Sequence, residues 1–247
     1  MILLKKIDKS ILVVLLSMCV GCSNTNSSND VVSNELSLNP IEEVQYSNDG
    51  KIISIDKFEY NNNNQLIKKT SENDEITYVY EDDVVVKSIR STGYSNYTYD
   101  DMKQLTRIDT YNLDNELIET RTHEYDDNGN VVRSAYEVIG EEPIVSLYTF
   151  DKTGKLVTVM VDNYKTTYEY DSSEKCIQET SYLNGIVDSN IISTYKDELL
   201  NTQITFKSDG SELIRLQYVY DENNRLIEIL SSTDNGNNFY KSTEYKY

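Results

Sequence analysis

The chain has 247 residues and a formal net charge of −19, with 42 acidic side chains against 23 Lys and Arg. A polyanion repels phosphate groups, so nucleic acids are excluded as partners. Tyr occurs 21 times, whereas Trp is absent and Pro occurs twice, a composition that favours extended strands.

Residues 1–21 have the pattern of an export signal, with Lys5, Lys6 and Lys9 preceding a short apolar run over residues 11–20. The sequence Cys19-Val20-Gly21-Cys22 that follows resembles the lipobox of bacterial lipoproteins, although Leu is commoner than Cys at its first position. The resemblance implies that Cys22 becomes the first mature residue and carries acyl chains such as palmitate. We therefore expect an exported protein held on the extracytoplasmic side of a bacterial membrane.

Residues 22–44 are small, polar and aperiodic after Cys22, which predicts a flexible tether. Of the three cysteines, Cys19 leaves with the signal and Cys22 is lipidated, so Cys176 has no partner for an internal disulfide. Cys176 occupies a position that is apolar elsewhere in the chain, and we interpret it as a buried hydrophobic residue.

Residues 45–247 repeat one phrase, in which an aromatic and an acidic residue are followed by an apolar residue six places after the aromatic. Such self-similarity marks a repeat architecture whose units stack on their neighbours. The clearest copies are Tyr99-Asp100 with Leu105, Tyr125-Asp126 with Val131, Phe150-Asp151 with Leu156, Tyr170-Asp171 with Cys176 and Tyr220-Asp221 with Leu226.

The residues between the aromatic and the apolar position have the chemistry of a turn. In Asp126-Asp-Asn-Gly129 and Asp151-Lys-Thr-Gly154, the first Asp can accept hydrogen bonds from the following amides. The Gly three places later can adopt the positive φ of a type I turn with a glycine bulge. Each unit is therefore predicted to be a β-hairpin, with the acidic residue in a structural role.

The spacing between successive aromatic positions varies from 14 to 25 residues, for example between Phe206 and Tyr220 and between Tyr125 and Phe150. A strict solenoid would keep its period. We therefore predict an all-β domain of repeated antiparallel hairpins over 45–247, which form an extended, curved or spiral meander sheet. Whether that sheet closes is left open.

The phrases Tyr-Thr-Tyr-Asp100, Tyr-Glu-Tyr-Asp171 and Tyr-Val-Tyr-Asp221 resemble the YD repeats of rearrangement-hotspot (RHS) proteins. The resemblance covers about residues 45–247 and implies long antiparallel sheets that wrap into spirals or shells, often on cell surfaces. The chain shows too few repeats for a full toxin-enclosing shell, so that role is not expected. MORN repeats would need more than the nine glycines present.

Catalytic signatures are weak, and we predict neither an enzyme nor a cofactor. His123 is the only His, which leaves little scope for a multi-His metal site or a Ser-His-Asp array, and we interpret it as a solvated strand residue. Adjacent acids on turns do not provide the two carboxylates across a cleft that a glycosidase needs. Asp126, Asp127 and Asn128 form a weak calcium candidate, because they offer hard oxygen ligands on a glycine turn.

The repeated tyrosines are interpreted as cross-strand partners. Four tyrosines outside the repeat register, Tyr94, Tyr136, Tyr164 and Tyr182, are weak candidates for ligand binding. The expected function is that of a lipid-anchored, non-enzymatic binding or interaction module for a carbohydrate or protein. The alternative is a purely structural spacer or assembly component of the envelope.

Overall fold

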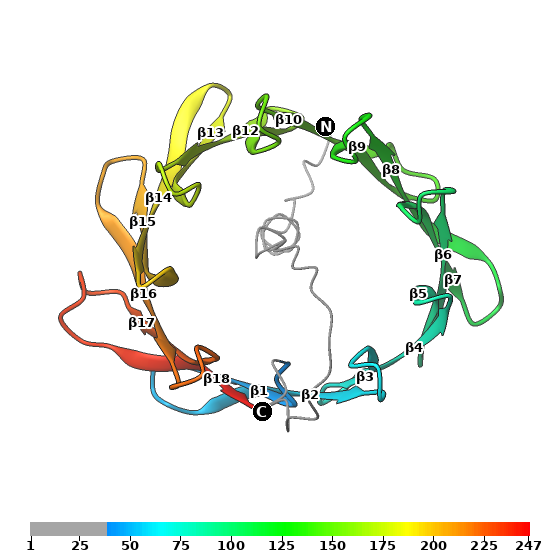
Figure 1. The fold of residues 1–247 in the computed structure, drawn as a ribbon, viewed down its shortest axis with the longest axis horizontal. Coiled ribbons are helices and arrows are strands. Elements are labelled where there is room, and N and C mark those ends of the chain that lie inside the picture. The colour runs from blue at the N-terminus through cyan, green and yellow to red at the C-terminus, as the bar shows by residue number, and fades with distance from the viewer. Residues whose placement is uncertain (1–38) are drawn as a thin grey trace, which may run out of the picture. The chain divides into compact units, whose positions relative to one another are not determined.

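The computed structural model describes residues 39–247, which form 18 β-strands in one sheet (Figure 1). The strands are β1 (Glu42–Tyr46), β2 (Ile52–Tyr60), β3 (Leu66–Thr70), β4 (Glu75–Glu81), β5 (Val84–Arg90), β6 (Gly93–Tyr99), β7 (Leu105–Asn112), β8 (Leu117–Tyr125), β9 (Val131–Val138), β10 (Ile144–Phe150), β11 (Leu156–Val161), β12 (Tyr164–Tyr170), β13 (Cys176–Leu183), β14 (Ile186–Lys196), β15 (Leu199–Lys207), β16 (Glu212–Tyr220), β17 (Leu226–Ser232) and β18 (Tyr240–Lys246). The prediction of an all-β protein built from antiparallel hairpins is confirmed.

The sheet closes into a barrel, so the expected extended or spiral shape is wrong. Every strand pairs antiparallel with the next one along the chain, and β18 pairs antiparallel with β1, with Val44 opposite Glu244. In Figure 1 the strands accordingly follow one another around a complete ring. Closure satisfies the hydrogen-bonding groups of the first and last strands, which would otherwise be exposed sheet edges.

The closing seam is held on its outer face by an ion-pair network. Lys241 lies 2.6 Å from Glu228 and 3.1 Å from Glu244, which also accepts a 2.8 Å hydrogen bond from the Tyr46 hydroxyl. Val44, at the centre of β1, is only 2% exposed. The first strand begins at Glu42, so residues 42–44 belong to the sheet and not to the expected tether.

We call the repeated aromatic residue of each hairpin unit its aromatic anchor. In the clearest copies of the repeat, the turn that follows this anchor has the predicted geometry. The Asp126 carboxylate accepts hydrogen bonds from the amides of Asn128 (2.9 Å) and Asn130 (2.8 Å). The Gly129 amide donates to the Asp126 carbonyl, and Gly129 has a φ of +83°. The register shifts by one residue opposite Tyr125, as expected for a glycine bulge. The repeated acidic residue therefore shapes the turn.

Nine aromatic anchors lie at or next to the ends of the nine even-numbered strands, and eight of them use a tyrosine hydroxyl to tie two strands together. Each hydroxyl donates to the backbone carbonyl of a residue within two positions of the start of the preceding odd-numbered strand, over 2.7 to 3.0 Å. The donors are Tyr60, Tyr80, Tyr99, Tyr125, Tyr170, Tyr195, Tyr220 and Tyr247. The ninth anchor, Phe150, has no hydroxyl.

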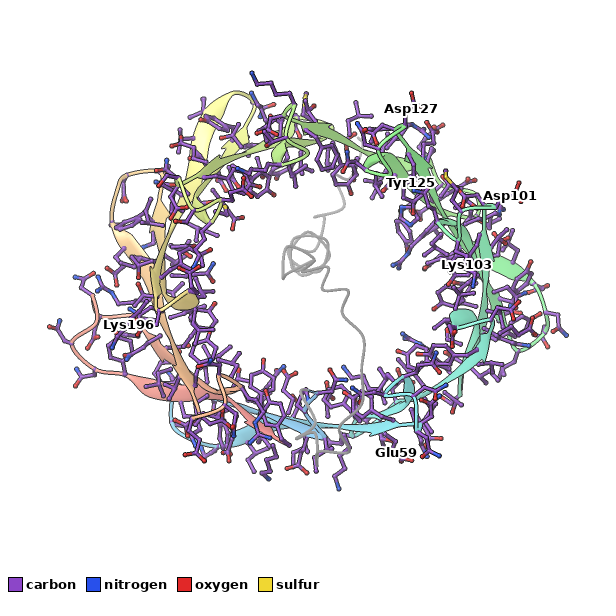
Figure 2. The ribbon with its side chains drawn as sticks, in the orientation of Figure 1. Glu59, Asp101, Lys103, Tyr125, Asp127 and Lys196 are labelled. Carbon is purple, nitrogen blue, oxygen red and sulfur yellow. The ribbon has the colours of Figure 1, made fainter. Side chains whose placement is uncertain are left out.

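The anchors face the inside of the ring. Figure 2 shows Tyr125 on the inner side, with Glu59, Asp127 and Lys196 on the outer side. Because side chains alternate between the two faces of a strand, the residues in phase with the anchors form the inner wall, and their neighbours form the outer face. Within the described part of the chain, no helix is long and apolar enough to cross a membrane.

Candidate functional site

The inner wall of the barrel is the candidate functional site, because it is not a packed core. Among residues 39–247, Val44 and Tyr168 are the only buried apolar residues. A barrel of this strand number is too wide for its inward side chains to fill. Figure 2 shows the inner side chains lining the wall without meeting across the ring. Within residues 39–247, the wall therefore presents tyrosine rings and hydroxyl groups to a lumen that their side chains do not fill.

A recess of about 260 Å³ lies on this wall between β5 and β8. Its lining includes two hydroxyl pairs that hydrogen-bond across neighbouring strands, Ser88 with Tyr97 at 3.1 Å and Ser95 with Thr110 at 3.0 Å. Ile108 adds an apolar surface beside the Tyr97 ring on the adjacent strand. The recess thus combines flat apolar surface with closely spaced hydrogen-bonding groups.

Charged groups at one side of the recess come from β8. Glu119 accepts a hydrogen bond from Arg121 (3.0 Å) and another from the Tyr136 hydroxyl (2.9 Å). The Arg121 guanidinium also lies over the Tyr136 ring, 5.0 Å from its centroid, in a cation–π contact. These contacts fix the orientation of Glu119 and Arg121, both of which line the recess. A ligand would meet an acceptor and a donor held side by side.

His123 lies two residues further along β8 on the same face. Its Nδ1 atom is 2.9 Å from the Ser134 hydroxyl, and it is half-buried rather than solvated, which corrects the expectation from the sequence. Burial and the nearby positive charge of Arg121 lower the pKa of His123. The imidazole is therefore neutral at pH 7, and its contact with Ser134 holds the ring against the wall.

The four tyrosines proposed for ligand binding do not converge. Tyr136 pairs with Arg121 across β8 and β9, which places it on the inner wall, and the register from β9 to β12 places Tyr164 there too. Tyr94 faces outward, where its ring stacks on Tyr111 with centroids 5.0 Å apart. Tyr182 also lies on the outer face. Tyr136 contacts Arg121, which lines the recess, and Tyr94 borders the recess together with Tyr111, on which its ring stacks.

The calcium candidate serves the turn. Both carboxylate oxygens of Asp126 accept hydrogen bonds, from the Asn128 and Asn130 amides and from the Asn130 side chain. The bonds from Asn130 and Asn128 lower the pKa of Asp126, and Asp127 points outward (Figure 2). Across residues 39–247, no group of three His, Cys, Asp or Glu side chains is placed to hold a metal ion.

The remaining sequence predictions concern the cysteines. Cys176 lies at the start of β13, in the apolar position of its repeat, and it is half-buried rather than buried. Its carbonyl accepts the hydrogen bond of the Tyr195 anchor. Cys22 lies outside the described residues.

Sequence reasoning missed Glu119 and Arg121. The signal that identifies them is their position on the strand: they lie six and four residues before the Tyr125 anchor of β8, and residues an even number apart on a strand share one face.

The structure defines a closed antiparallel barrel of hairpin repeats, in which an aromatic residue ends every second strand and an acidic turn usually follows it. The chain belongs to the teneurin YD-shell family, whose model matches residues 37–246.

The solved structures matched by this chain are covered over very different shares of their own length. A structure described as TcdB2-TccC3-TEV matches 77% of this chain and 14% of its own chain, with 13% identity and a TM-score of 0.29. This chain therefore spans about a seventh of that protein's length. A porin-like protein from Bacteroides uniformis matches 83% of this chain and 95% of its own, with 10% identity and a TM-score of 0.49. No match was found among curated proteins.

Proposed function

We propose that this protein is a lipid-anchored, non-enzymatic binding module of the bacterial envelope that binds carbohydrate on the inner wall of its barrel. The observation that carries the proposal is the recess between β5 and β8, where paired hydroxyls, tyrosine rings and the Glu119–Arg121 pair line one surface. A sugar offers the complementary features, since it has adjacent hydroxyls at its edge and an apolar face. The volume of about 260 Å³ lies just below the range of roughly 300–1,000 Å³ that is usual for small-molecule sites, which suits a ligand of one sugar unit.

Binding would use groups that are already oriented. Glu119 can accept a hydrogen bond from one sugar hydroxyl while Arg121 donates to its neighbour, and the Tyr97 ring offers an apolar face. Hydrogen bonds to charged groups contribute about 1.5–3 kcal/mol each, roughly twice the contribution of neutral ones. The Glu119–Arg121 pair should therefore dominate the affinity.

One pair of inner-wall carboxylates, Glu43 and Asp56, does not have the properties that glycoside hydrolysis requires. Glu43 and Asp56 face each other on β1 and β2. Burial opposes ionisation of Asp56, but its ion pair with Lys69 at 2.7 Å and a hydrogen bond from Ser71 lower its pKa overall. A glycosidase needs one carboxylic acid whose pKa is raised, so that it can protonate the leaving group. The lowered pKa of Asp56 does not meet that need. Burial raises the pKa of Glu179 on β13, so hydrolysis is disfavoured here at the Glu43–Asp56 pair alone.

The anchor in this proposal is Cys22, whose acyl chains would hold the protein at the membrane without a spanning segment. The described barrel starts near Pro40, at the rim where Tyr60 binds the Pro40 carbonyl. Metabolic labelling with a palmitate analogue tests the anchor, because a Cys22→Ala variant should lose the label. Equal labelling of the two proteins would remove the anchor from the proposal.

A glycan array probed with the full chain in detergent tests the binding function, with envelope and capsular glycans as the immobilised ligands. Arg121→Gln should weaken binding of the best ligand by about tenfold or more, which corresponds to 1.4 kcal/mol.

Arg107→Gln is the matched control. Arg107 is similarly exposed and also bonds an acid two residues away, Asp109, but it faces outward. Absence of saturable binding to any glycan would instead favour the alternative role of an envelope spacer.

A further inference from the structure

One rim of the barrel collects most of the large apolar side chains that the protein exposes. This hairpin rim consists of the nine turns that connect odd-numbered strands to even-numbered ones, residues 47–51, 71–74, 91–92, 113–116, 139–143, 162–163, 184–185, 208–211 and 233–239. Twelve of the sixteen exposed large apolar residues of the described chain lie in these turns or within two residues of them: Ile52, Ile53, Ile89, Leu113, Ile118, Val138, Ile139, Met160, Ile186, Val187, Leu213 and Phe239.

These side chains do not serve the fold. Leu113 is 72% exposed and Ile186 is 73% exposed, each at or beside the tip of a hairpin. Figure 1 shows the β7–β8, β13–β14, β15–β16 and β17–β18 hairpins projecting away from the ring. Ile52 and Ile53 border a hollow of about 500 Å³ at the same rim. Concentrated exposed apolar surface of this kind marks an interaction site.

The same turns are strongly acidic. They contain a single basic residue, Lys51, and ten acidic ones: Asp49, Glu72, Asp74, Asp114, Glu116, Glu141, Glu142, Asp162, Asp209 and Asp234. Ion pairs remove little of this charge, since Asp49 pairs with Lys51 and Asp74 with Arg90. A surface that meets this rim must place positive charge next to apolar groups.

We infer that the hairpin rim docks a partner protein whose contact surface combines apolar side chains with Lys or Arg. The kind of partner follows from charge complementarity, because an acidic rim favours a basic protein surface. A second copy of the chain would bring ten further acids against the rim, and an anionic lipid surface would be repelled in the same way. The rim borders the recess at Thr92 and Ile118, but Leu113, Ile186 and Phe239 do not line it, so docking at these tips does not depend on glycan binding.

A designed amphipathic helix with leucine on one face and lysine on the other is the probe, and its binding to the full chain is measured by fluorescence anisotropy. Replacing three apolar tips together (Leu113→Ser, Ile186→Ser and Phe239→Ser) should raise the Kd about tenfold or more. All three residues are exposed, so the melting temperature should be unchanged. A triple variant of exposed apolar residues away from the rim (Ile41→Ser, Val79→Ser and Met102→Ser) should bind like the parent chain.

Three results would overturn the inference. The first is an equal loss of binding in the two triple variants. The second is equally tight binding of a helix with glutamate in place of lysine. The third is rim-dependent binding to vesicles of phosphatidylcholine and phosphatidylglycerol, or rim-dependent dimerisation in sedimentation, either of which would identify a different occupant.

Discussion

The tyrosine anchors predict how much stability one hydroxyl group adds. In Tyr125→Phe the aromatic ring remains, but the 2.8 Å hydrogen bond to the Leu105 carbonyl is lost. A neutral hydrogen bond contributes about 0.5–1.5 kcal/mol net, so the free energy of unfolding should fall by about 1 kcal/mol. For a domain of this size, the melting temperature should fall by about 2–4 °C.

The one natural exception gives the converse test. Phe150 ends β10 as the other anchors end their strands, and the shared register directs its ring toward the start of β9 at Val131. A hydroxyl added by Phe150→Tyr should therefore find the Val131 carbonyl and stabilise the protein by up to about 1 kcal/mol.

Thermal and urea unfolding followed by circular dichroism measure both changes. Tyr94→Phe is the control, because its hydroxyl bonds only to the exposed Asn115 side chain at 3.2 Å, and it should change stability by less than about 0.5 kcal/mol. If Tyr125→Phe were as stable as the parent chain while Phe150→Tyr were less stable, the anchors would not be stabilising strand ties.

Three further predictions concern a turn, a titrating side chain and the closing seam. Glu174 holds a φ of +68° where Gly154 stands in the preceding YD turn, so Glu174→Gly should stabilise and Gly154→Glu destabilise, each by about 1 kcal/mol in urea unfolding; changes of the same sign would contradict this. The lowered pKa of His123 means that the unfolded chain takes up a proton first as the pH falls below about 6.5. His123→Gln should therefore reduce the loss of stability between pH 7.5 and pH 5, as measured by melting temperature, and an unchanged loss would refute that coupling. Val44→Ala, at a buried seam position, should cost about 1–2 kcal/mol, whereas Val79→Ala, 38% exposed, should cost under about 0.5 kcal/mol; equal costs would argue against a packed seam.

The local parts of this fold could be predicted because their causes are local. The turn after Tyr125 follows from Asp126 and Gly129, three residues apart, and the alternation around Tyr97 and Tyr99 defines a strand. Closure depends instead on the accumulated twist of nine hairpins and on the pairing of β18 with β1, which no short segment encodes.

The site was harder to predict for a related reason. A charged pair such as Glu119 and Arg121 is usually a solvated strand surface, and only its phase with Tyr125 places it on the inner wall. The prediction that tyrosines outside the repeat register bind a ligand differs in outcome between residues. Tyr136 contacts Arg121 on the inner wall, whereas the Tyr94 ring stacks on Tyr111 on the outer face. Knowing which face of the sheet is concave was the missing information.

Binding inside the lumen is the central claim, and filling the recess tests it most directly. Ser95 lines the recess, and Asn96, the next residue on β6, faces outward opposite Asp109. With the best glycan from the array, labelled and titrated against the full chain, Ser95→Trp should raise the Kd by about tenfold or more, and Asn96→Trp should leave it unchanged. Parent-like binding by the Ser95→Trp protein, or equal loss in both variants, would contradict recognition at the inner wall.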